Sequence, residues 1–204
     1  MTTEIGTTPL EIQVHLEDGR VAKFQQTDPT VIKHTLDNFQ PTRVFSQKVL
    51  MFGDDQSLSA FQVNAVARID LVAPYVPDYP FYNGVLDIQM ITPDEFKERY
   101  VPKTFVALRQ HAQENPGEPI TVFSEFELVN GQRLFQQVCV RLEERLPLEQ
   151  GMFVSHLFNA HGLHGRCREG GVIVVNPTNI LRFTLYPPPP TLPPGAWAGN
   201  RVIE

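Results

Sequence analysis

The sequence has little of several features that would assign a chain to a known class. It contains two cysteines, Cys139 and Cys167, which are too few for a disulfide framework and fit a reduced, cytoplasmic location. Its longest apolar runs, such as residues 171–175, are far too short to cross a bilayer, so we expect no membrane partner. Residues 1–10 are mostly polar and show no secretory signal.

Positive charge is also scarce. The chain has 17 Lys and Arg against 23 Asp and Glu, a formal net charge of −6. Non-specific binding to nucleic acid depends on an excess of basic side chains that displace counterions from phosphates. The charge balance therefore disfavours RNA as a partner. A local basic face would still allow it, and such a face would gather Arg20, Lys23, Lys33, Arg43 and Lys48.

Signatures of catalysis are missing as well. The pair Gly170-Gly171 stands alone, without the further glycines of a phosphate-binding loop. Ser124 and Ser155 lack the flanking glycines of a nucleophile elbow. The carboxylates that are adjacent in the sequence would point in different directions on a strand or a helix, so they form no natural acid–base pair. We therefore predict no cofactor and favour a protein that is not an enzyme.

Short alternating segments and strong turn signals make up most of the chain. Ile12, Val14 and Leu16 alternate with polar residues, which is the period of a half-buried strand. Asp18-Gly19 follows and indicates a hairpin turn, because both central positions of a type I′ turn need a positive φ. By the same reasoning we expect further strands at residues 21–24, 44–52, 58–64, 67–72, 85–91, 122–128, 133–142, 152–158, 171–175 and 180–186.

Helices are predicted where a capping residue precedes a proline. Asp28-Pro29 starts a helix that runs to about residue 39. Thr92-Pro93 starts a second one, and Glu95 completes a capping box. A third helix is expected over residues 105–113. Together these elements predict an α+β fold in which β-structure dominates.

The first and second halves of the chain resemble each other in sequence. Each half closes on a proline, Pro74 in the first and Pro187 in the second. Four matches fall in the same order: residues 16–20 with 128–132, 24–26 with 135–137, Val63-Asn64 with Val175-Asn176, and 68–71 with 182–185. A tandem duplication would give two similar barrel-like or sandwich-like β halves, although any two hairpin-rich segments can share such fragments. The predicted units are an N-terminal β-rich repeat (11–74), an aromatic and proline-rich connector with a helix (75–119), a C-terminal β-rich repeat (120–187) and a proline-rich tail (188–204).

Residues 61–71 form a strand, a short polar corner and a second strand followed by a proline, and this pattern resembles the second signature of Sm-like proteins. Residues 14–19 are similar to the hairpin that opens the first signature of that family. The resemblance implies five-stranded SH3-like barrels, ring-like assembly and RNA contact through Asn64 and Arg68. The matching residues of the second half, Asn176 and Arg182, are candidate binding residues on the same ground.

The most specific local pattern of candidate metal ligands consists of His161, His164 and Cys167. Their His-x2-His-x2-Cys spacing offers three ligands of the softness that zinc prefers. A fourth ligand is missing, and the segment is expected to be a loop between two strands. A solvent-exposed hairpin tip is the favoured interpretation, and a metal-dependent enzyme is the alternative.

Two proline-rich segments are candidate contact regions. Residues 74–82 combine Tyr, Phe and Pro and would either bind a ligand or cover the seam between the halves. Residues 187–197 would either serve as a polyproline ligand anchored by Trp197 or lie across the protein itself. We predict a non-enzymatic binding or assembly module that has a protein partner or self-assembles. A nucleic-acid-binding Sm-like protein and a metal-dependent enzyme are the alternatives.

Overall fold

The computed structural model describes residues 9–54, 56–73, 77–81, 84–141, 152–167, 170–188, 197 and 199. It confirms an α+β fold in which β-structure dominates. The strands are β1 Leu10–Leu16, β2 Val21–Gln26, β3 Val49–Gly53, β4 Leu58–Gln62, β5 Val66–Val72, β6 Val85–Ile91, β7 Ile120–Leu128, β8 Arg133–Val140, β9 Leu163–Arg166, β10 Val172–Val175 and β11 Ile180–Tyr186. The α-helices are α1 Pro29–Asn38, α2 Pro93–Arg99, α3 Phe105–Glu114 and α4 Met152–Asn159, and short 3-10 turns are η1 Val44–Ser46, η2 Val63–Ala65 and η4 Pro177–Asn179.

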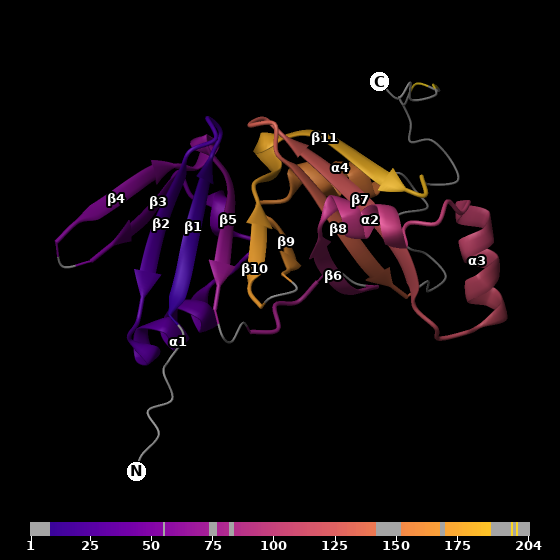
Figure 1. Ribbon diagram of the computed structural model, residues 1–204, viewed down its shortest axis with the longest axis horizontal. Coiled ribbons are helices and arrows are strands. Elements are labelled where there is room, and N and C mark those ends of the chain that lie inside the picture. The colour runs from indigo at the N-terminus through magenta and orange to yellow at the C-terminus, as the bar shows by residue number, and fades with distance from the viewer. Residues whose placement is uncertain are drawn as a thin grey trace, which may run out of the picture.

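Nine strands form one sheet, in the order β11-β7-β8-β6-β9-β10-β5-β1-β2, while β3 and β4 form a separate hairpin. Antiparallel pairing of β5 with β10 joins the strands of the first half to those of the second. Figure 1 shows the two groups on the left and right of the molecule, with β9 and β10 between them. Among the described strands the order is open, with β2 and β11 at its ends. The two predicted halves therefore share a sheet, and the domain boundaries proposed from the sequence stay a prediction.

A three-stranded unit occurs at both ends of this sheet. β1 lies between β2 and β5, and β7 lies between β8 and β11. In the first unit Arg68 is opposite His15, and in the second Arg182 is opposite Glu127. In both units a 3-10 turn precedes the arginine strand, and the register shifts between the first residue of that strand and the arginine. This geometry is compatible with a duplication, which stays a prediction.

The core lies on both faces of the central strand β10. Val172 and Val174 belong to a cluster that also contains Leu36 of α1 and Leu50 of the β3–β4 hairpin. Val175 belongs to a second cluster, on the opposite face, because successive side chains of a strand point to opposite sides. The sheet is therefore covered on both faces at the seam between the two halves.

The helix starts behave as their capping residues predict. The Asp28 side chain accepts hydrogen bonds from the first turn of α1. Thr92 Oγ1 accepts from the Glu95 amide at 3.2 Å, and Glu95 Oε2 accepts from the Thr92 amide at 2.9 Å, which completes the capping box of α2. No helix in the described part of the chain is long and apolar enough to span a membrane.

Three strand predictions were wrong in part or in full. Residues 152–158 form helix α4, in which Leu157 is buried while His156 and Phe158 are exposed. A short apolar run does not by itself separate a strand from a helix, and here packing against the second core cluster decides. Residues 44–52 divide into η1 and β3, and β4 ends before Val63. Residues 142–151, which include the expected connection at 146–150, and most of the proline-rich tail lie outside the described residues.

Candidate functional site

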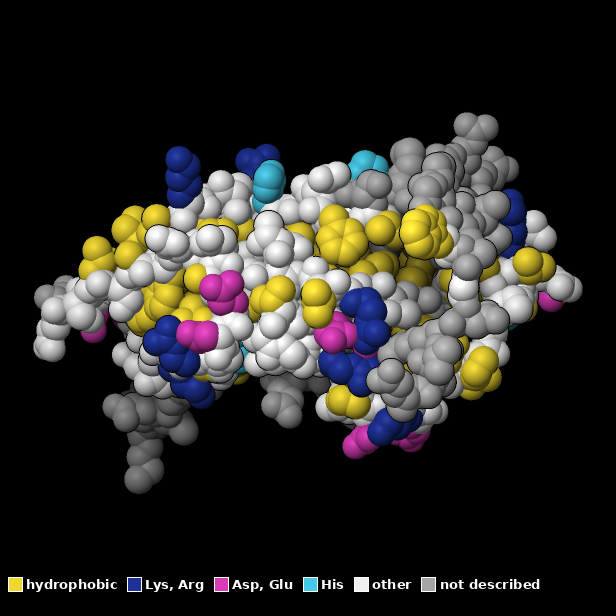
Figure 2. Space-filling view, turned by 90° about the horizontal axis from the view of Figure 1, so that it is seen from above, with side chains coloured by type: hydrophobic (Ala, Val, Ile, Leu, Met, Phe, Trp, Pro, Cys, Tyr) yellow, Lys and Arg dark blue, Asp and Glu magenta, His cyan; other side chains and the backbone are white. Residues whose placement is uncertain are grey.

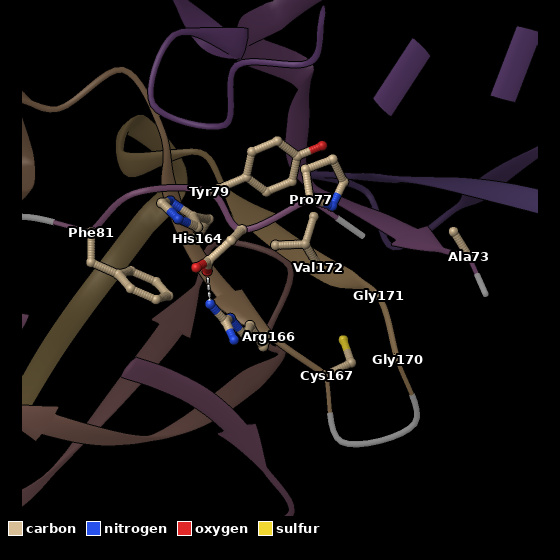
Figure 3. A pocket seen from close by; sticks show the side chains of 11 residues that line it. Ala73, Pro77, Tyr79, Phe81, His164, Arg166, Cys167, Gly170, Gly171 and Val172 are labelled. Atoms are coloured by element: carbon tan, nitrogen blue, oxygen red, sulfur yellow. Dashed lines mark hydrogen bonds and ion pairs between the residues drawn. The ribbon is translucent and has the colours of Figure 1, made fainter. Parts of the chain in front are cut away.

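A cavity of about 240 Å³ lies at the seam between the two halves. Its walls come from the end of β5, the connector at residues 77–81 and the β9–β10 hairpin (Figure 3). The aromatic stretch and the histidine cluster that stand out in the sequence thus meet in one place. The lining residues are Ala73, Pro77, Asp78, Tyr79, Phe81, His164, Arg166, Cys167, Gly170, Gly171 and Val172.

Glycines allow the β9–β10 hairpin to lie close to its neighbours. A Cβ atom at Gly165 would lie 2.9 Å from the Met90 sulfur, so β9 packs on β6 only without a side chain there. At Gly171, which has a φ of +119°, a Cβ atom would lie 2.3 Å from the Leu71 carbonyl oxygen. Because side chains alternate along β9, His164 and Arg166 share the face that lines the cavity.

Two aromatic residues of the connector hold His164 in place. The Tyr79 hydroxyl donates a hydrogen bond of 2.8 Å to the Leu36 carbonyl at the end of α1. The edge of the Tyr79 ring meets the His164 ring at a centroid distance of 6.2 Å. Phe81 stacks on His164 at 4.8 Å, with the ring planes 10° apart. The connector thereby fixes the imidazole between the first half and the second.

His164 is a buried, neutral hydrogen-bond acceptor. Its residue is 6% exposed, and this burial lowers the pKa of His164 below its ordinary value. A hydrogen bond to the backbone of Tyr79 opposes the shift, and the positive charge of Arg166 adds to it. The hydrogen bond to the Tyr79 backbone favours the protonated ring, so the ring donates this bond to the Tyr79 carbonyl oxygen. Because Nε2 has no partner in the described part of the chain, we assign the proton of the neutral ring to Nδ1. Nε2 is then an acceptor, and it is buried without a hydrogen-bond partner among the described residues.

Arg166 lies at the rim of the cavity with its charge compensated. Its guanidinium forms an ion pair with Asp78, drawn as a dashed line in Figure 3. A second carboxylate, that of Asp87, lies 3.6 Å from the Arg166 Nε. The guanidinium carbon lies 5.7 Å from the centre of the Phe81 ring, within cation–π range. Two acidic groups therefore outnumber the one basic group at this rim.

The predicted metal ligands do not converge. His164 and Cys167 both line the cavity, whereas His161 has an exposed side chain and accepts a bond from the Phe45 amide through its carbonyl. Within the described residues, no group of three or more His, Cys, Asp and Glu side chains gathers in a way that could hold a metal ion. The expected loop is also wrong for residues 163–166, which form β9 and pair with β10.

The two predicted asparagines lie away from the cavity lining. Asn176 is fully buried, and its Nδ2 donates to the carbonyls of Val63 and Val66 at 2.9 Å each. Asn64 is exposed, and its carbonyl accepts a bond from the Asn179 side chain. Asn176 thus ties the turn before β11 to the turn before β5.

The two predicted arginines are ion-paired within the sheet. The Arg68 side chain is 14% exposed and donates to Asp70 Oδ2 at 3.1 Å, and the same oxygen lies 2.9 Å from His15 Nε2. Arg182 pairs with Glu127 at 2.5 Å. Asn176 lies beside the turn that holds Asn64 and near Arg68. The side chains of Asn176, Arg68 and Arg182 all have partners within the protein, and their role in binding stays a prediction.

The basic side chains that an RNA-binding face would need are also distributed. Arg20, Lys23 and Lys33 each form an ion pair with a nearby carboxylate. Figure 2 shows basic side chains in separate places on the face in view, several of them beside acidic ones. This arrangement gives the nucleic-acid hypothesis no geometric support.

Comparison with known proteins gives no information about this cavity. No family model matches the chain, and no match was found among the curated proteins or the solved structures. Sequence reasoning had marked the 74–82 stretch and the 161–167 cluster separately. It missed that Tyr79 and Phe81 pack on His164, because no local signal carries a contact between segments about 85 residues apart.

Proposed function

We propose that this chain is a non-enzymatic binding protein whose ligand enters the seam cavity and packs against its aromatic and aliphatic walls. One observation carries the proposal: the connector and the β9–β10 hairpin, which are far apart in the sequence, together line one cavity of about 240 Å³.

The walls of the cavity support binding through their rigidity. Tyr79 is buried and anchored to α1, and Phe81 is stacked on the His164 ring, so this wall of the cavity is ordered before any ligand arrives. A site that is ordered in advance loses less entropy on binding. The aromatic walls also offer broad apolar contact. These features favour recognition of a small molecule.

Cys167 provides a built-in reporter for the test. It lines the cavity, whereas Cys139 lies in β8, is not part of the lining, and has its pKa raised by burial and by the nearby Asp87. A library of single-ring compounds should contain ligands that slow the alkylation of Cys167 by iodoacetamide and leave the rate at Cys139 unchanged. The Phe81→Ala variant, which removes part of the aromatic wall of the cavity, should lose that protection. Failure of every compound to protect Cys167, or equal protection in the variant, would contradict the proposal.

Self-assembly is a second candidate, supported by the outer face of the β3–β4 hairpin. Val49, Met51 and Leu58 are 38%, 63% and 70% exposed, and Ala60 lies opposite Met51 on the same face. Figure 2 shows hydrophobic side chains at this end of the molecule. A second copy could cover this face by two-fold apposition of the hairpins.

Light scattering coupled to size exclusion tests this candidate. The unmodified chain should elute with the mass of a dimer, and the double variant Met51→Lys and Leu58→Lys should elute as a monomer. A monomeric mass for the unmodified chain at about 100 μM would refute the assembly.

A further inference from the structure

We infer that a second copy of this chain pairs its strand β11 with the open edge of β4, head to tail, in the way that β5 pairs with β10 inside the chain. The inference rests on the self-assembly candidate above and is independent of the seam cavity. It places two different strands in contact, whereas a two-fold contact would join two copies of the same hairpin. Three observations lead to it: the order of the elements, the strand pairing at the seam, and the exposure of the matching strands.

The described elements follow the same order in both halves. Leaving aside the short turn η1, the first half runs β1, β2, α1, β3, β4, η2, β5, and the second runs β7, β8, α4, β9, β10, η4, β11. Because η2 and β5 have the same lengths as η4 and β11, these segments match residue by residue, and Arg68 matches Arg182. The same spacing carried back along the chain matches residues 58–61 of β4 with residues 172–175 of β10.

The packing of β4 and β10 supports this alignment. Phe61 of β4 packs against Phe24 in the core of the first half, and the matched Val175 of β10 packs in the core of the second half. The sequence match of Val63 with Val175 differs from this alignment by two residues, because Val63 lies in a turn and Val175 lies in a strand. β4 and β10 therefore have the same orientation toward their own halves.

The seam shows how one half covers the core of the other. β10 of the second half pairs antiparallel with β5 of the first half, with Val172 opposite Leu71 and Val174 opposite Ile69. All four side chains belong to the core cluster of the first half and are 0–2% exposed. A strand of the second half thus completes the core of the first.

The matching strands at the two ends of the molecule have open edges. Among the described strands, β4 pairs with β3 alone and β11 ends the nine-stranded order (Figure 1). Leu58 of β4 is 70% exposed and Ala60 is also exposed, whereas the matched side chains of β10 are buried. Leu181 of β11 is 67% exposed, whereas the matched Ala67 of β5 is fully buried. Apolar positions that are buried at the seam are therefore exposed at both ends.

A second copy fits both open edges because it carries the matching strand. In the geometry of the seam, Leu58 lies opposite Leu185 of the next copy, and Ser59 lies opposite Thr184 of the next copy. Residues 58–62 include no charged residue and no proline, the features that commonly protect an open strand edge. Main-chain hydrogen bonds along a paired edge provide affinity, and the side chains of the two strands provide specificity. Such a head-to-tail contact repeats until the assembly closes on itself.

Disulfide trapping tests the contact directly. In a background with Cys139→Ala and Cys167→Ala, a full-length chain with Ser59→Cys is mixed with one that carries Thr184→Cys. The mixture should form an intermolecular disulfide at least about tenfold faster than either variant alone, because the contact holds the two thiols at a high effective concentration. A mixture of Ser59→Cys with Lys23→Cys, which lies on β2 at the other end of the strand order, is the matched control and should not show this acceleration.

Light scattering coupled to size exclusion gives a second measurement. The Leu181→Lys variant places a charge in the head-to-tail contact and should lower the mass of the assembly toward that of a monomer. Val106→Lys on α3 is the matched control, since Val106 is 66% exposed and lies outside the proposed contact. Its mass should equal that of the unmodified chain. Both variants replace exposed side chains, so both should fold.

The possible results separate this inference from the other proposals. If Ser59→Cys cross-links with itself as fast as with Thr184→Cys, or if Leu181→Lys leaves the mass of the assembly unchanged, the head-to-tail contact is overturned and the two-fold contact stands. A monomeric mass for the unmodified chain would overturn both forms of self-assembly. None of these results bears on the seam cavity, which the alkylation of Cys167 tests separately.

Discussion

Asn176 offers the sharpest test of the reasoning, because the sequence marks it as a binding residue and the structure gives it a structural role. The residue is fully buried between β10 and the turn η4. Its Nδ2 donates to the carbonyls of Val63 and Val66, and its Oδ1 accepts from the amide and the hydroxyl of Thr178. Replacing it with alanine removes all four hydrogen bonds, so Asn176→Ala should destabilise the protein.

The size of the loss can be worked out from these bonds. The capping bond to Thr178 is worth about 1 kcal/mol, and each bond to the Val63 and Val66 carbonyls contributes about 1 kcal/mol net. Both carbonyls keep another donor, the Val66 amide and the Asn179 side chain respectively, so the full penalty for a stranded acceptor does not apply. The free energy of unfolding should therefore fall by about 3 kcal/mol. For a chain of this size that corresponds to a Tm lower by about 6–12 °C.

Urea and thermal denaturation followed by circular dichroism measure this loss. Asn64→Ala is the matched control, since Asn64 is the sequence counterpart of Asn176 and its side chain is exposed. The control should stay within about 0.5 kcal/mol of the unmodified chain. If Asn176→Ala is as stable as the control, the structural assignment of this asparagine is refuted.

Three further predictions concern the hairpin, a helix cap and the buried histidine. Gly171→Ala should cost at least about 2 kcal/mol in urea denaturation, because a φ of +119° strains an alanine and its Cβ would overlap the Leu71 carbonyl; a fully stable variant would rule out this close approach. Thr92→Ala should cost about 1 kcal/mol by loss of the capping box with Glu95, and an unchanged urea midpoint would show that the cap does not contribute. The pKa of His164 is lowered in the folded state, so the unfolded chain binds the proton more readily, and stability should fall as the pH drops below about 6.5 toward the lowered pKa of the folded state. The His164→Gln variant should lack this part of the pH dependence, and an identical slope in both proteins would contradict the assignment.

The local elements of the fold could be read from short segments of sequence. Asp18-Gly19 and Asn130-Gly131 form hairpin turns as predicted, with φ values of +86° and +80° at the two glycines, but Asp18 and Asn130 have no positive φ, so the turns are not of type I′. The caps of α1 and α2 also follow from neighbouring residues. Such signals work because the groups involved lie within a few residues of one another, and their geometry depends little on the rest of the chain.

Where the sequence carries no local signal, the structure of a segment and the role of its residues depend on contacts with distant parts of the chain. Residues 152–158 are apolar enough for either a strand or a helix, and the buried side of α4 follows from its contact with the second core cluster. Arg68 stands out in the sequence as a residue for an outside partner. In the structure it contacts Asp70 from its own strand, and His15, 53 residues away, shares that carboxylate. Its role therefore required the pairing of β1 with β5.

The sequence by itself determined the α+β class, most of the strands, the two capped helices and a third helix over residues 105–113. It also marked the two segments that form the candidate site, residues 74–82 and 161–167. Only the tertiary structure decided that both halves join in one sheet through β5 and β10, and that Tyr79 and Phe81 enclose His164. The reason is physical: capping and turn formation are local, whereas strand order and the burial of a polar ring are set by packing between segments far apart in the chain. Through that packing, His164 and Cys167, two of the three residues that suggested a metal loop, line one wall of a cavity.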